Sequence, residues 1–118
     1  GGIGLQLLGL GSNGHVGFNE PPCPLDQHCH EVLLTPATRH QNAALFDGCL
    51  EAVPQRAITL GLQEILEAAE IHLVVTGAAK AGILKRLLAL REPDPALPAS
   101  WLLTHPNVWL WCDAAALA

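Results

Sequence analysis

Short apolar runs, separated by glycine-rich, proline-rich or polar segments, divide the chain into expected strands and helices. The runs 3–9 (IGLQLLG) and 71–77 (IHLVVTG) have the composition of strands that are buried on both faces of a sheet. Shorter extended pieces are expected at 31–34, 56–60 and 108–112. The pattern therefore predicts several short strands with longer polar or helical segments between them.

Apolar residues recur at helical spacing in the segments between these strands. Thr35 followed by Pro36 is typical of a helix start, and we expect this helix to run to about residue 46, before Gly48. Further helices are predicted at 61–69, 81–90 and 99–103. Strands that alternate with helices indicate an α/β fold, a Rossmann-like three-layer sandwich built on a mainly parallel sheet.

Composition and charge exclude several classes of function. The chain has 118 residues, half of them apolar and 14% charged, which suits one compact domain at most. The net charge is −5 and the six Lys and Arg residues do not cluster, so no nucleic-acid partner is expected. No apolar run approaches the roughly 18 to 20 residues of a membrane span, and the start lacks a secretory signal pattern. We expect a cytoplasmic protein with no membrane partner.

The four cysteines are irregularly spaced, which fits reduced thiols better than a disulfide framework. The segment CPLDQHCH holds possible metal ligands at Cys23, His28, Cys29 and His30. Their spacing matches no zinc pattern, so no metal site is predicted. The three tryptophans are expected to pack in the core or at a subunit contact.

The candidate chemistry lies in GLGSNGHVGFNEP, residues 9–21, which leaves the first predicted strand at the sheet edge where α/β folds bind ligands. Its glycines, among them Gly9, Gly11 and Gly14, allow close approach of the backbone to a ligand. No amphipathic helix follows, so the loop is not a dinucleotide fingerprint. His15 and Glu20 can form a proton-transfer pair if the loop folds back, and a plain tight turn is the structural alternative.

The string LGLGSNGHVGFNEP resembles the active-site segment of glucosamine-6-phosphate deaminases, G-x-G-x-[DN]-G-H-[IV]-[AG]-F-N-E-P. Four further segments are similar to family segments in the same order: TRHQNAALF (38–46), VPQRAITLGLQEILEA (53–68), LVVTGAAKA (73–81) and PASWLLTHPNVWLWCD (98–113). The related 6-phosphogluconolactonases share the fold, but their loop lacks FNEP, which favours the deaminase side. The resemblance covers the carboxyl-terminal half of the family's chain, so residues 1–118 are expected to form a partial domain.

The resemblance implies an enzyme that converts glucosamine 6-phosphate and water to fructose 6-phosphate and ammonia, without a metal or a redox cofactor. By this resemblance His15 shuttles a proton between the ring oxygen and the anomeric hydroxyl, and Glu20 and Asn13 hold the imidazole. Lys80 matches the phosphate-binding lysine, and Gly9, Gly11 and Gly14 belong to the substrate-binding loop. The expected ligand is therefore a small sugar phosphate.

Two departures from the family limit this expectation. The position of the family's phosphate-binding arginine is occupied by Ala44 here. Arg39 or Arg56 could substitute for that arginine. The half of the family's chain that is not matched supplies the base acting between C2 and C1, and neither Asp26 nor Asp47 lies in a matching motif. We therefore expect only the ring-opening half of a site.

Three alternatives follow from these departures. The substrate could be galactosamine 6-phosphate or another sugar phosphate, or the chain could be a non-catalytic remnant that binds a sugar phosphate or a partner subunit. Because a truncated sheet exposes an edge and apolar faces, we also expect a homo-oligomer.

Overall fold

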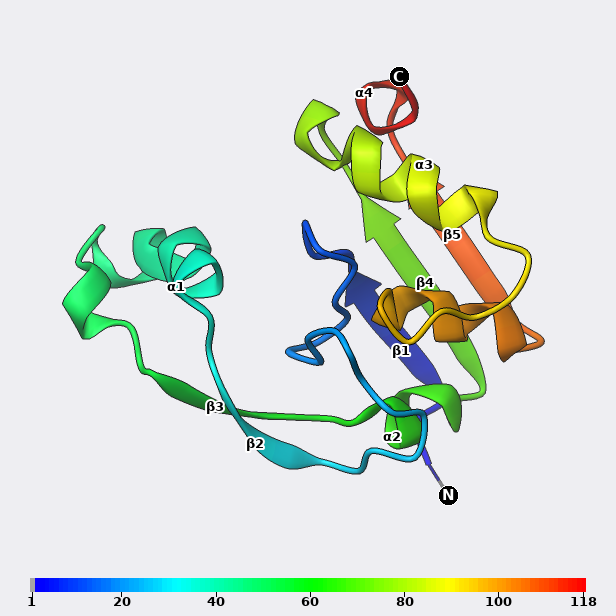
Figure 1. Ribbon diagram of the computed structural model, residues 1–118, viewed down its shortest axis with the longest axis horizontal. Coiled ribbons are helices and arrows are strands. Elements are labelled where there is room, and N and C mark those ends of the chain that lie inside the picture. Colours follow the sequence, from blue (N-terminus) through cyan, green and yellow to red (C-terminus); the bar gives the residue numbers. More distant parts are fainter. Residues whose placement is uncertain (1) are drawn as a thin grey trace.

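A three-stranded parallel sheet organises the computed structural model, which describes residues 2–118 (Figure 1). The strands β1 (Leu5–Gly9), β4 (Glu70–Val75) and β5 (Val108–Cys112) lie in the order β1-β4-β5. Gly9 stands opposite Val74, so the carboxyl ends of β1 and β4 lie side by side. The predicted α/β class with a parallel sheet is confirmed, and the sheet brings the loop after β1 next to the turn after β4.

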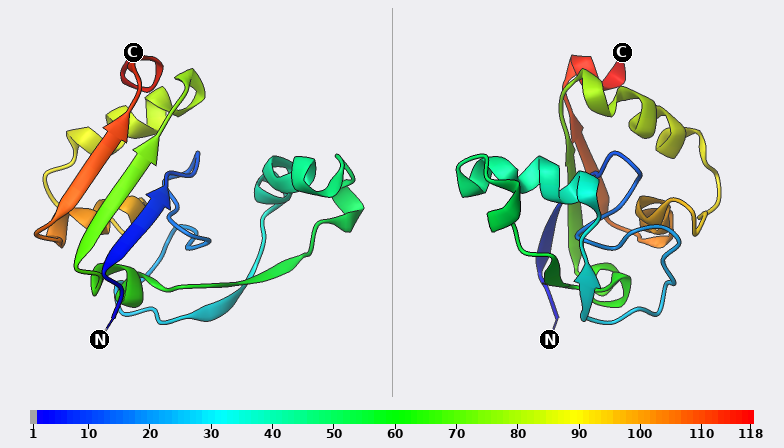
Figure 2. Two further views of the ribbon diagram at one scale, coloured as in Figure 1. Left: turned by 180° about the vertical axis from the view of Figure 1, so that it is seen from behind. Right: turned by 60° about the vertical axis from the view of Figure 1, so that its left-hand side comes forward.

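Helices cover one face of this sheet (Figure 2). They are α2 (Leu62–Leu66), α3 (Ala81–Ala89) and the 3₁₀ segment η4 (Pro98–Thr104), and the short helix α4 (Ala114–Leu117) packs against α3. Alternate strand residues point into this layer and are almost fully buried with helix side chains: Leu8, Ile71, Leu73, Val75, Leu62, Ile65, Leu84 and Leu102. Burial of this apolar surface is the main source of stability.

A second, smaller unit extends beside the sheet. The antiparallel ribbon of β2 (His30–Leu33) and β3 (Arg56–Thr59) leads to α1 (Pro36–Asn42) and two 3₁₀ turns, η1 (Ala43–Phe46) and η2 (Leu50–Ala52). Thr35 caps α1, since its side chain accepts a hydrogen bond from the Thr38 amide. The Arg39 guanidinium donates to the carbonyls of Leu50 and Val53 at 3.0 and 2.9 Å, which ties the end of this unit together.

The observed elements agree with the expected ones in position and differ in detail. The helix expected over 36–46 begins at Pro36 but changes to a 3₁₀ turn after Asn42, and the helix expected at 99–103 is 3₁₀ throughout. Helix α4 was not expected, because Ala-rich residues with a single leucine show no apolar stripe. Its start is set by Asp113, whose carboxylate accepts from the Ala116 amide at 2.8 Å.

The opposite face of the sheet is bare in the part of the chain that the structure describes, so two of the three expected layers lie within it (Figure 2). Leu7, Trp109 and Trp111 are 64%, 53% and 55% exposed there. Trp109 and Trp111 are therefore surface residues and not core residues, whereas Trp101 packs against the core. The His72 ring stacks near both indoles, and its Nδ1 accepts from Trp111 Nε1 at 2.9 Å.

None of the helices described between residues 2 and 118 is long and apolar enough to cross a membrane.

We expect the bare sheet face to drive self-association that rises with concentration in sedimentation velocity, because it exposes a contiguous apolar surface. Trp109→Glu places a charge on this face and should weaken association at least about tenfold. Leu45→Glu is the matched control, since Leu45 is 80% exposed on η1, away from the sheet. A chain that stays monomeric across the concentration series contradicts this expectation.

Candidate active site

The glycine-rich loop after β1 turns back on itself and holds the imidazole of His15 against its own backbone. The Gly11 amide donates to the His15 carbonyl at 2.9 Å, and the Gly14 amide donates to the Gly11 carbonyl at 2.9 Å. A Cβ at Gly11 would lie 2.2 Å from His15 Nδ1, so the ring occupies the space that any other residue needs. Gly14 has a φ of +88°, and the space beside it is filled by Leu97, which again requires glycine.

Buried polar contacts fix the second half of the loop. The Asn19 side chain is almost fully buried, and its Nδ2 donates to the carbonyls of Val16 and Leu60 at 2.9 Å each. The Phe18 amide donates to Thr59 Oγ1 at 3.1 Å. These bonds tie the loop to the end of β3, so His15 and Glu20, which lie on either side of this anchor, are held in place.

Asn13 lies between His15 and Glu20 and contacts both. Its Oδ1 is 2.8 Å from His15 Nδ1, and its Nδ2 donates to Glu20 Oε2. The Glu20 carboxylate also accepts from Thr38 Oγ1 at 3.2 Å, and its Oε1 is 3.5 Å from His15 Nδ1. Because a carboxylate only accepts hydrogen bonds, the Asn13 amide must turn its NH₂ to Glu20 and its oxygen to His15. Nδ1 of His15 then carries the proton, and Nε2 is left as the basic nitrogen.

Burial lowers the pKa of His15 below its ordinary value, and this effect outweighs the neighbouring Glu20 carboxylate, which raises the pKa. The Lys80 ammonium lowers the pKa further. The His15 side chain is only 14% exposed. Near neutral pH the imidazole is therefore neutral and can accept a proton at Nε2.

Lys80 lies after the carboxyl end of β4 and contacts the loop that follows β1. It closes the 3₁₀ turn η3 (Ala78–Lys80) after β4, and its Nζ donates to the Leu10 carbonyl at 2.7 Å. The turn is held by the Asp113 carboxylate, which accepts from the Gly77 amide at 3.1 Å. Lys80 is therefore a fixed cation beside the loop.

His15 and Lys80 line the same polar pocket, which has a volume of about 290 Å³. Its lining is made of loop residues, one residue of α1 and the lysine: Gly9, Leu10, Gly11, His15, Gly17, Gln41 and Lys80. Of the predicted substrate-binding glycines, Gly9 and Gly11 reach the pocket, whereas Gly14 is outside the lining and packs against Leu97.

None of the four side chains considered as replacements for the family's phosphate-binding arginine and second base lines the pocket. Arg39 is bound to η2 and the residue after it, and Arg56 forms an ion pair with Glu31 on the ribbon. Asp26 and Asp47 are exposed and do not line the pocket. Neither the second phosphate-binding cation nor the second base is supplied by these residues.

Sequence reasoning missed Thr38 and Gln41. Thr38 binds Glu20, and Gln41 is the residue of α1 in the pocket lining. Both lie in the segment TRHQNAALF, so the signal was its match to the family rather than any pattern of charge or hydropathy.

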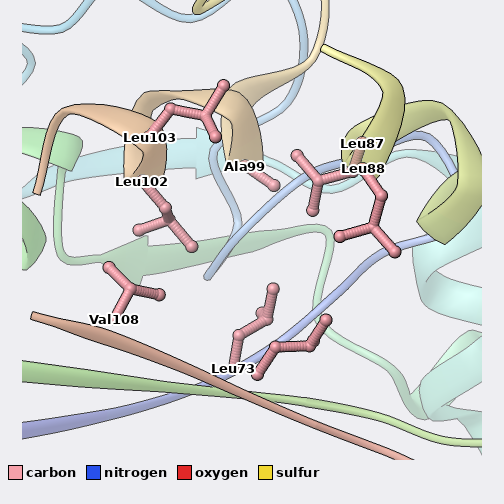
Figure 3. A pocket seen from close by; sticks show the side chains of 8 residues that line it. Leu73, Leu87, Leu88, Ala99, Leu102, Leu103 and Val108 are labelled. Carbon is pink, nitrogen blue, oxygen red and sulfur yellow. The ribbon is translucent and has the colours of Figure 1, made fainter. Parts of the chain in front are cut away.

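A separate apolar cavity of about 180 Å³ lies between α3, η4 and the sheet (Figure 3). It is lined only by aliphatic side chains, among them Leu73, Leu87 and Leu102, so it offers no group for acid–base chemistry. Within residues 2–118 no three His, Cys, Asp or Glu side chains gather closely enough to hold a metal ion.

Comparison with known proteins places the chain in a family. A family model described as "Glucosamine-6-phosphate isomerases/6-phosphogluconolactonase" matches residues 2–111, and the chain belongs to this family. It is 50% identical over 116 residues to a glucosamine-6-phosphate deaminase of Shouchella clausii and 50% identical over 117 residues to one of Rhodopirellula baltica. These alignments cover 98% of the chain and 46% and 45% of the relatives, so the chain spans about half the length of the curated relatives it matches.

Solved structures agree with this assignment. A monomeric glucosamine-6-phosphate deaminase matches with a TM-score of 0.90 and 39% identity, over 97% of this chain and 47% of that chain. A 6-phosphogluconolactonase from Trypanosoma cruzi matches with a TM-score of 0.68 and 20% identity, over 98% and 40% of the two chains, and shares the fold. The resemblance and the fold class inferred from the sequence are thus confirmed.

An NMR titration of the histidine ring resonances tests the electrostatics of the site. The pKa of His15 should lie below its ordinary value of 6.5, because the ring is buried. Glu20→Gln should lower it further, and Lys80→Ala should raise it, because each variant removes one of the two opposing charges. Two variants that leave the His15 midpoint unchanged would show that these charges do not act on the ring.

Proposed function

We propose that the chain carries the ring-opening half of the active site of an amino-sugar phosphate deaminase that acts on glucosamine 6-phosphate. The observation that carries this proposal is that His15, whose ring is held by Asn13 and Glu20 behind it, lines one polar pocket together with Lys80. The relatives that share half of its residues are glucosamine-6-phosphate deaminases, which supports the same substrate class.

His15 is the proton carrier in this proposal. Opening the pyranose ring removes the proton of the anomeric hydroxyl and adds a proton to the ring oxygen as the C1–O5 bond breaks. A single imidazole can do both, first as base and then as acid, if its pKa lies near the working pH. The bond from Nδ1 to Asn13 fixes the tautomer, so the unprotonated Nε2 accepts the anomeric proton.

Lys80 is the proposed phosphate contact. Its ammonium lies in the lining opposite the glycine loop, and the bond to Leu10 leaves two of its three protons for a ligand. A fixed positive charge beside a loop of closely approachable backbone suits a phosphate dianion.

The later steps of deamination need a base that moves a proton from C2 to C1 before water replaces the amine as ammonia. Among the described residues, the carboxylate closest to His15 is Glu20, and it is already bound to Asn13 and Thr38. A free base is not supplied by Asp26 or Asp47, which do not line the pocket. The proposed chemistry of the chain alone therefore ends at ring opening.

We expect the purified 118-residue chain to release little or no ammonia from glucosamine 6-phosphate, because it lacks the second base. A coupled ammonia assay measures this, with the deaminase of Shouchella clausii as the positive control. Turnover by the isolated chain that disappears in His15→Ala would overturn the half-site proposal and show a complete enzyme.

Lys80→Ala should weaken binding of glucosamine 6-phosphate about 10- to 100-fold, the worth of one charge-assisted contact. Isothermal titration calorimetry gives the Kd of each variant. Lys85→Ala removes the same charge from the exposed side of α3 and should leave the Kd unchanged. Equal losses in the two variants would indicate that Lys80 acts through net charge alone.

A further inference from the structure

Gln41 lines the same pocket as His15 and Lys80, and its amide has no assigned role. The side chain is exposed on α1 and makes no hydrogen bond to another residue within the described range 2–118. By contrast, the amide of the neighbouring Asn42 is used within the helix, where its Nδ2 donates to the Thr38 carbonyl at 2.9 Å. A primary amide offers two donors, so Gln41 presents unused N–H groups to whatever fills the pocket.

The pocket lining offers few side-chain donors for a phosphate. Lys80 is the one lysine or arginine in the described lining, and one of its protons is held by the Leu10 carbonyl. Burial lowers the pKa of His15, so its ring is neutral at the pH where it accepts a proton. Because phosphate oxygens accept several hydrogen bonds, further donors are needed to bind the dianion.

The place of Gln41 in the chain fits this need. It lies three residues before Ala44, the position at which similar family segments carry an arginine. Gln41 lies in the last turn of α1, whereas Ala44 lies beyond it in η1 and is outside the pocket lining. The side-chain donor of α1 that reaches the pocket is therefore Gln41.

We propose that the Gln41 amide donates to the phosphate oxygens of the bound sugar phosphate and takes the place of the family's arginine. The assignment rests on the proposed function, since it needs a sugar phosphate in this pocket. A neutral amide binds phosphate more weakly than a guanidinium, so this chain should hold its ligand with lower affinity than a relative that carries the arginine.

Titration calorimetry with two probes, glucosamine 6-phosphate and inorganic phosphate, tests the assignment on the full 118-residue chain. Gln41→Ala should weaken both probes by a similar factor, about three- to tenfold, the worth of one neutral hydrogen bond. Gln41→Arg should tighten both, because it restores a charge-assisted contact. His40→Ala is the matched control, since His40 is exposed on the same helix and does not line the pocket.

The outcomes separate this assignment from the proposed function. If the unsubstituted chain binds neither probe, the proposed function and this assignment both fail. If the chain binds and Gln41→Ala behaves like His40→Ala, only the Gln41 assignment fails. A loss confined to glucosamine 6-phosphate, with inorganic phosphate unaffected, means that Gln41 contacts the sugar and also overturns the assignment.

Discussion

The parallel pairing of β1 with β4 positions both the hydrophobic core and the candidate site. It aligns the carboxyl ends of two strands whose following segments are far apart in the chain: Leu10 and Lys80 are 70 residues apart and share a hydrogen bond. The same pairing sends Leu8 and Leu73 into the core, so the burial that stabilises the fold also sets the site. The strand pairing that forms the core therefore also holds the residues of the candidate site in position.

The side-chain amide of Asn13 sets the orientation and the tautomer of the His15 imidazole. Asn13 is neutral, so it orients His15 without adding the charge that an aspartate would bring, and Glu20 supplies the nearest negative charge. Burial dominates the pKa of His15 and lowers it. The loop thus holds a neutral base in a fixed tautomer, and the glycine at position 11 makes room for the ring.

Sequence reasoning predicted the strands and the site for different reasons. Buried strands such as β4 carry a continuous apolar run, and the helix start at Thr35 has a local cap, so both could be inferred from neighbouring residues. Lys80 and His15 were paired through the family resemblance, because no local pattern indicates that two residues 65 positions apart line the same pocket. No pattern of charge or hydropathy indicates that Gln41 lines the pocket, since this depends on how the ribbon of β2 and β3 carries α1 to it. The bare sheet face was expected only in outline, and the sequence left open whether Trp109 and Trp111 pack in the core or lie at a subunit contact.

In the proposed function this chain opens a sugar ring without completing deamination. Exchange NMR of glucosamine 6-phosphate tests this proposal, because ring opening interconverts the two anomers and needs only the proton transfer proposed for His15. We expect the chain to accelerate anomer exchange without release of ammonia, and we expect His15→Ala to abolish the acceleration. An exchange rate equal to that of the free sugar phosphate, at a concentration where the ligand is bound, would contradict the assignment of His15 as the proton carrier.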